Sequence, residues 1–241
     1  MLLADKSTER NWKQIIAQLT AVVGIKGIIQ RREELITYEC DGLTSYRERP
    51  ALVILPKTTA QVAAAVKICD QNNLAWIARG AGTGLSGGAL PVENCVLIVT
   101  SLMNQILKTD LDNQRVVVQP GVINNWVTQA VSGGGFYYAP DPSSQVICSI
   151  GGNIAENSGG VHCLKYGVTT NHVLGLKLVI PSGEIIDVGG EIGEMPGYDL
   201  TGLFVGSEGT LGIATEITLK ILKTPESICV LLADFVSVEA A

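Results

Sequence analysis

The chain has 241 residues and a composition typical of one large globular domain or two small lobes. Hydrophobic residues make up 46% of it and charged residues 17%, which excludes a disordered chain of low hydrophobicity. The formal net charge of −6 leaves no basic surplus to neutralise phosphates, so we expect no nucleic-acid partner.

Neither a metal site nor a membrane span is expected. His162 and Cys163 are adjacent, but two ligands without a second cluster cannot complete a four-coordinate site. The most apolar run, residues 95–102, is shorter than the roughly 20 residues that cross a bilayer. Because the six cysteines are dispersed and form no CxxC pair, we expect a reducing, cytoplasmic location, with membrane association only through a partner.

The first part of the chain predicts strands that alternate with helices. Apolar residues recur at helical spacing over residues 8–23, and later runs are short and continuously apolar, as in buried strands. The predicted elements are a helix at 8–23 capped by Ser7 or Thr8, a strand at 51–55, a helix opened by Thr58 or Thr59, and strands at 74–78 and 96–100.

The second part predicts hairpins and loops. Two strands at 105–109 and 115–119 flank a turn at Asp112 and Asn113, and a helix at 122–131 is ended by Gly133. About forty residues rich in glycine, asparagine and serine follow and are predicted as loops. The later elements are a hairpin at 174–180 and 185–188, a short helix at 198–204 and an alternating strand at 213–221.

This order of elements predicts an α+β fold with two lobes in place of a doubly wound sheet. Residues 1–48 form an N-terminal helical arm. Residues 49–223 form the main domain, with lobes at about 49–104 and 105–223. Residues 224–241 begin a further, truncated domain, with an apolar strand from Leu231 and a helix from Ser237.

The loop after the strand at 74–78 contains the pattern G-x-G-x-x-G at residues 82–87. A Rossmann site requires this pattern to open a helix, but Gly88 and Pro91 continue a helix poorly. A phosphate-binding P-loop requires Gly-Lys-Ser/Thr after the glycines, and that sequence is absent. Two interpretations stay open, namely backbone N–H groups that converge on an anion, and a flexible surface turn.

Several motifs, in this order, resemble the FAD-linked oxidases of the vanillyl-alcohol oxidase or PCMH-type family. Over residues 38–223 the chain is similar to the branch that contains the glycolate oxidase D subunit and FAD-linked D-lactate dehydrogenases. The motifs are residues 79–88 (RGAGTGLSGG), 140–144 (PDPSS), 150–160 (IGGNIAENSGG), 165–167 (KYG), 197–200 (GYDL) and 206–212 (GSEGTLG).

The resemblance implies a PCMH-type FAD-binding domain with FAD between its lobes. The diphosphate loop would contribute Arg79, Gly80, Ala81, Gly82, Thr83, Gly84, Leu85 and Ser86. The flavin and ribityl region would contribute Pro140, Asp141, Ser144, Gly151, Gly152, Asn153, Asn157, Gly159 and Gly160, and the adenine end Glu208, Gly212 and Ile213. Thr83 stands where some members carry a histidine bonded to flavin, so we expect noncovalent FAD.

By the same resemblance, FAD oxidises a small 2-hydroxy acid, glycolate or D-lactate, to the 2-oxo acid by hydride transfer to flavin N5. The catalytic residues are unknown, since the family places them in a second half. His162 as a base is disfavoured, because no acidic residue lies near it in the sequence. The alternatives are a non-catalytic FAD-binding module that requires a partner half and, more weakly, a reductase or non-redox flavoenzyme. The family also implies an iron–sulfur partner subunit.

Overall fold

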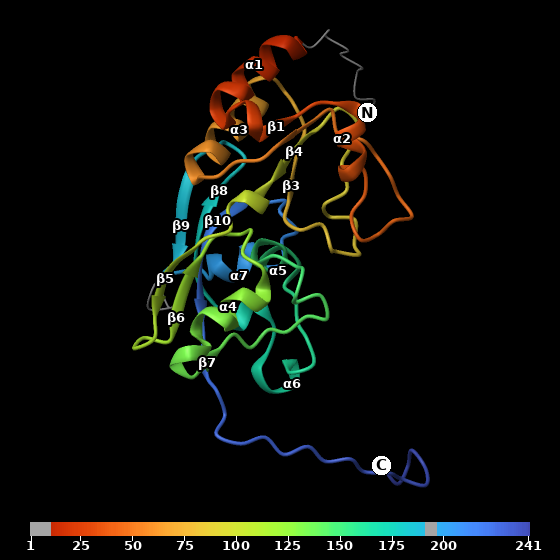
Figure 1. The fold of residues 1–241 in the computed structure, drawn as a ribbon, viewed down its shortest axis with the longest axis vertical. Helices are drawn as coiled ribbons and strands as arrows, with labels where there is room; N and C mark the ends of the chain where they lie inside the picture. Colours follow the sequence, from red (N-terminus) through yellow and green to blue (C-terminus); the bar gives the residue numbers. More distant parts are fainter. Residues whose placement is uncertain (1–10, 191–196) are drawn as a thin grey trace.

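The computed structural model describes residues 11–190 and 197–241 and shows two lobes, each built on one large sheet (Figure 1). The first sheet has the strand order β1-β2-β4-β3 and the second the order β5-β6-β10-β8-β9. The first sheet combines parallel strands with helices and the second is an antiparallel sheet, so the predicted α+β fold with two lobes is confirmed.

The first sheet is buried on both faces. Its central strands β2 (Leu52–Ile54) and β4 (Val96–Val99) run parallel and have no exposed residue, which explains their continuously apolar sequence. β3 (Trp76–Arg79) pairs parallel with β4, and β1 (Ile28–Ile29) pairs antiparallel with β2. Helices α1 (Trp12–Val23) and α3 (Thr59–Gln71) pack with one face, and α2 (Arg32–Leu35) with the other.

The N-terminal cap was predicted correctly for one of the two long helices of the first lobe. Thr58 caps α3 as predicted, because its side chain accepts a hydrogen bond from the N–H of Gln61. The predicted cap of the first helix, Ser7 or Thr8, lies outside the described residues. The described helix α1 begins at Trp12, and Asn11 caps it by accepting from the N–H of Gln14. Residues of the predicted arm thus pack in the first lobe, while the domain boundaries at 48 and 223 stay predictions.

The second sheet is antiparallel throughout, as the predicted hairpins require. It consists of β5 (Ile106–Asp110), β6 (Arg115–Val118), β8 (Val173–Val179), β9 (Ile185–Gly189) and β10 (Ile213–Lys220). Its core includes α4 (Asn124–Val131), α5 (Ile150–Glu156) and the strand residues Leu176, Ile217 and Leu219. The remaining elements are α6 (Cys163–Tyr166), α7 (Leu200–Phe204) and the 3-10 helices Ile25–Gly27, Ile36–Tyr38, Thr100–Leu102, Ser132–Gly134 and Thr169–His172.

Two predictions in this lobe were wrong. The glycine-rich stretch after residue 133 was predicted as loops, but it contains α5, whose apolar residues Ile150 and Ile154 are buried. Gly133 was predicted to end the helix at 122–131, but a 3-10 turn follows α4, and the left-handed residue that stops this turn is Gly135, with φ of 77°. Only after that turn does the chain reverse into β7 (Phe136–Tyr137).

The C-terminal segment carries neither of the elements predicted for it. β11 (Leu222–Lys223) pairs with β7, and residues 224–241 then extend away from both lobes without strand or helix (Figure 1). The strand predicted from Leu231 does not form, because no strand among residues 11–190 and 197–241 lies beside it as a pairing partner. At Ser237 the chain forms a single turn, closed by a hydrogen bond of 3.3 Å from the N–H of Ala241 to the carbonyl of Ser237.

Candidate functional site

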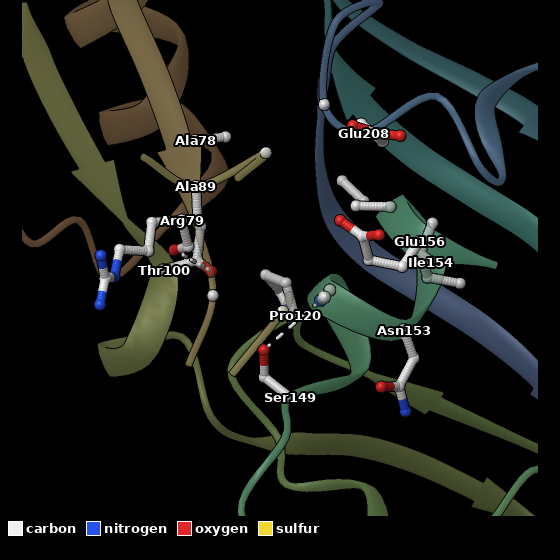
Figure 2. Close-up of a pocket in the computed structure, with 18 of the residues that line it drawn as sticks. Ala78, Arg79, Ala89, Thr100, Pro120, Ser149, Asn153, Ile154, Glu156 and Glu208 are labelled. Carbon is white, nitrogen blue, oxygen red and sulfur yellow. Dashed lines mark hydrogen bonds between the residues drawn. The ribbon is translucent and has the colours of Figure 1, made fainter. Parts of the chain in front are cut away.

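A cavity of about 150 Å³ lies between the two lobes. The first lobe contributes the end of β3 and the loop that follows it, and the second contributes α5 and the turn that leads into β10 (Figure 2). Parallel strands deliver their carboxyl ends to one edge of a sheet, so this loop emerges where ligands of open parallel sheets commonly bind.

The loop at residues 82–84 presents backbone donors to the cavity. Gly82 has φ of 71°, a conformation that residues with side chains rarely adopt, and a side chain there would collide with the guanidinium of Arg79. Within residues 11–190 and 197–241, the N–H groups of Gly82, Thr83 and Gly84 find no protein acceptor. Neighbouring unused N–H groups of this kind form anion sites.

The loop is held directly against the first turn of α5. The N–H of Ala81 donates to Ser149 Oγ over 3.2 Å, and the same oxygen accepts from the N–H of Gly152 as the cap of the helix. Gly80 packs so closely on this hydroxyl that a side chain there would collide with it. One serine side chain therefore couples the loop that follows β3 in one lobe to the helix of the other.

Arg79 supports the loop from behind. Its Nη1 donates to the carbonyl of Cys40 over 2.7 Å, and its guanidinium lies 5.9 Å from the ring centroid of Tyr38. Burial lowers the pKa of Arg79, while the nearby Asp41 carboxylate acts in the opposite direction. Figure 2 shows the side chain directed away from α5, so it occupies a structural position and does not face the opposite wall.

Two carboxylates line the other side of the loop. Glu156, the last residue of α5, accepts a hydrogen bond of 2.8 Å from Ser86 Oγ. Glu208 has φ of 52°, and Gly88 lies between the two acids, since a side chain there would meet both carboxylates within 3.4 Å. This wall is polar and carries acceptors, whereas the loop wall carries donors.

The structure brings most of the predicted site residues to the cavity. Those that line it are Arg79, Gly80, Ala81, Gly82, Thr83, Gly84, Ser144, Gly151, Gly152, Asn153, Glu208, Gly212 and Ile213. The other predicted residues are not among those that line it, namely Leu85, Ser86, Pro140, Asp141, Asn157, Gly159 and Gly160. Some of these have structural partners. Asn157 Oδ1 accepts from the N–H of Thr170, and the carbonyl of Pro140 accepts from Asn124 Nδ2.

Sequence reasoning missed several lining residues. Asp41, Thr100, Pro120, Ser149 and Glu156 also line the cavity. Ser149 had a usable signal, since a serine before Ile150 and Ile154, spaced four residues apart, is typical of a capped helix. No sequence signal pointed to Asp41, because only the fold brings residues 40–43 against the loop.

The two histidines have different surroundings. His162 Nδ1 lies 2.5 Å from Asp141 Oδ2, so this histidine has an acidic partner that its distance in the sequence concealed. Its side chain is 63% exposed and does not line the cavity. His172 is buried, and burial lowers its pKa. In the part of the chain that the structure describes, no three acidic, cysteine or histidine side chains gather as metal ligands, and no helix is long and apolar enough to cross a membrane.

These features define a domain with a polar cleft between two α+β lobes. Residues 50–189 match the family model described as FAD binding domain, so the chain belongs to this family of FAD-binding proteins. The unused N–H groups at residues 82–84 and the glycines packed around them fit the diphosphate of such a cofactor.

Curated relatives narrow the class further. The chain is 52% identical over 214 residues to the glycolate oxidase subunit GlcD of Escherichia coli K12, covering 89% of this chain and 43% of the relative. It is 43% identical to GlcD of Bacillus subtilis, and that match covers 95% of this chain and 49% of the relative. It is 39% identical to a D-lactate dehydrogenase of Anaerostipes hadrus, and that match covers 80% of this chain and 41% of the relative. The chain thus spans less than half the length of these relatives.

Solved structures confirm the fold. A 4-ethylphenol oxidase from Gulosibacter chungangensis superimposes with a TM-score of 0.80 at 23% identity, covering 94% of this chain and 45% of that one. A p-cresol methylhydroxylase superimposes with a TM-score of 0.77 at 19% identity, and the match covers 94% of this chain and 46% of that one. The predicted two-lobed FAD-binding architecture is therefore confirmed.

Proposed function

We propose that this chain is the FAD-binding half of an enzyme that oxidises glycolate or D-lactate to the 2-oxo acid. The identity of 52% to a glycolate oxidase subunit, spread over 89% of the chain, carries this proposal. The cleft agrees with it, since it offers a donor-lined wall for a diphosphate and neutral polar groups such as Asn153 and Ser158 beyond it.

The residues that would hold FAD come from both lobes. The N–H groups of residues 82–84 would receive the diphosphate, and Ser149 would keep that loop in register with α5. We assign the remaining predicted contacts to the flavin, the ribityl chain and the adenine, in the order given by the resemblance. When bound, FAD supplies the hydride acceptor, and the protein orients it and excludes water from it.

A second candidate is a module that binds FAD but does not catalyse. Oxidation of a hydroxy acid needs a base for the hydroxyl proton and a cation for the carboxylate. Among the described residues that line the cavity, the cation is Arg79, and its side chain is directed to the carbonyl of Cys40. We therefore propose that catalysis needs groups from outside this chain, either a second half of the protein or a partner subunit, for which an iron–sulfur protein is our candidate.

An anaerobic absorbance experiment tests whether this chain holds FAD and whether it can oxidise a hydroxy acid by itself. The purified chain is loaded with FAD, freed of excess, and mixed with glycolate and separately with D-lactate. Bleaching of the flavin bands by either acid shows that these residues suffice for oxidation. A stable oxidised spectrum supports the FAD-holding half that awaits its complement. A chain that retains no flavin contradicts both.

We also propose that the FAD is held noncovalently, because Thr83 occupies the loop position at which covalent relatives carry a histidine. Acid precipitation should release all of the flavin into the supernatant. A yellow fluorescent band that survives a denaturing gel would contradict this proposal.

A further inference from the structure

A buried carboxylate at the edge of the cavity has an oxygen without a hydrogen-bond partner in the part of the chain that the structure describes. Asp41 is 5% exposed and lines the cavity together with the diphosphate loop. Its Oδ1 accepts a hydrogen bond of 2.8 Å from the N–H of Leu43. Its Oδ2 is buried and has no hydrogen-bond partner within the described residues.

The backbone fixes Asp41 in this position. A side chain at Gly42 would come within 2.8 Å of the carbonyl of Thr83 and 2.6 Å of that of Gly84, so residue 42 packs directly against the loop. The preceding residue, Cys40, accepts the hydrogen bond of Arg79. Asp41 is thus held on both sides by contacts to the diphosphate loop and its supporting arginine.

The chemistry of the unused oxygen restricts what it can bind. A buried acceptor without a donor is unfavourable, so such groups in native proteins commonly await a ligand or water. A carboxylate repels the diphosphate itself, which has no donors. The groups next to a diphosphate in a flavin dinucleotide are the ribityl chain and the ribose, and both carry neutral hydroxyl donors.

We infer that Asp41 Oδ2 accepts a hydrogen bond from a sugar hydroxyl next to the diphosphate of the bound dinucleotide. This inference rests on the proposed FAD site but not on the proposed oxidation. Asp41 would position the cofactor and favour a hydroxyl-bearing ligand, while the N–H groups of residues 82–84 bind the diphosphate.

The test compares the wild-type chain with Asp41→Asn and with the control Asp112→Asn. Asparagine keeps an oxygen for the N–H of Leu43, so the turn is retained, while the unused acceptor becomes an amide donor. Asp112 is exposed in the turn between β5 and β6, so its substitution makes the same chemical change away from the cavity. Dissociation constants are measured by calorimetry for FAD, FMN and ADP.

We expect Asp41→Asn to weaken FAD binding roughly tenfold or more, and the control to leave it within about twofold, because hydrogen bonds to charged groups are among the stronger ones. If Asp41→Asn also weakens the binding of FMN, the hydroxyl belongs to the ribityl chain. If it also weakens the binding of ADP, the hydroxyl belongs to the ribose. Equal affinities of the folded variant and the wild type for all three ligands would overturn the inference. A wild-type chain that binds none of them would overturn it too.

A second measurement, made on the wild-type chain, tests the inference even if Asp41→Asn does not fold. The wild-type chain is titrated with 2′,3′-dideoxy-ADP and with an FMN analogue whose ribityl hydroxyls are removed. At least one analogue should bind roughly tenfold more weakly than its parent ligand. No loss with either would overturn the inference. If FAD binding depends on Asp41 but no hydroxy acid reduces the flavin, the inference stands and oxidation requires groups from outside this chain. If a hydroxy acid reduces the flavin but Asp41→Asn binds all three ligands as the wild type does, the proposed oxidation stands and the inference fails.

Discussion

At the scale of single residues, His172 links the stability of the second lobe to pH. It is 3% exposed, its Nε2 lies 2.9 Å from the carbonyl of Tyr166, and its Nδ1 is buried with no partner within the described residues. Burial lowers the pKa of His172 below the ordinary 6.5, so the folded protein holds the ring neutral while the unfolded chain protonates it. We predict that the free energy of unfolding falls as pH drops through 6.5 and levels off once the folded ring is protonated.

Urea unfolding between pH 8 and pH 5 checks this prediction, with a loss of about 1.4 kcal/mol for each unit by which the folded pKa is lowered. The control is straightforward, because the chain has only two histidines. His162→Gln, at the surface, should keep the dependence near pH 6.5, whereas His172→Gln should flatten it. A wild-type protein that gains stability on acidification over this range would refute the neutral buried ring.

At the scale of elements, α5 shows both what the sequence could predict and where it failed. The buried strands β2 and β4, the two hairpins and the Thr58 cap were predicted, because each depends on a local pattern of apolar or capping residues. α5 was missed because Gly151 and Gly152 disfavour a helix. Packing overrides that preference, since a side chain at Gly151 would lie 2.7 Å from Pro120 Cβ. Similarly, Asp41 reaches the site only through tertiary contacts.

Ser149→Ala tests the coupling between α5 and the diphosphate loop. It removes the cap of α5 and the acceptor of the Ala81 N–H, so we predict a loss of about 1 kcal/mol in the free energy of unfolding together with weaker FAD binding. Thr58→Ala is the matched control, because it removes a similar cap from α3, whose residues do not line the cavity. Both variants should lose stability, measured by urea unfolding, but only Ser149→Ala should lose affinity for FAD. Equal affinities in the two variants would rule out the coupling.

At the scale of the whole molecule, the segment after β11 exposes an unusual amount of apolar surface. Leu232 is 99% exposed and Val236 100%, and Ile228, Val230, Leu231 and Val238 are each more than 80% exposed. Contiguous exposed apolar surface promotes association, so we predict that the isolated chain self-associates as its concentration rises.

Sedimentation velocity over a range of concentrations, in reducing buffer because Cys229 is exposed, measures this association. Removing residues 226–241 keeps the backbone hydrogen bond from Thr224 to Gly135 and should shift the chain toward monomer. A full-length variant with Leu231, Leu232 and Val236 replaced by serine should behave like the truncated chain, because it removes the apolar surface without changing the length. If both variants still associate, the surface responsible lies elsewhere. The next positions to substitute are then Val161, just before α6, and Leu164, within it, whose exposed fractions are 85% and 103%.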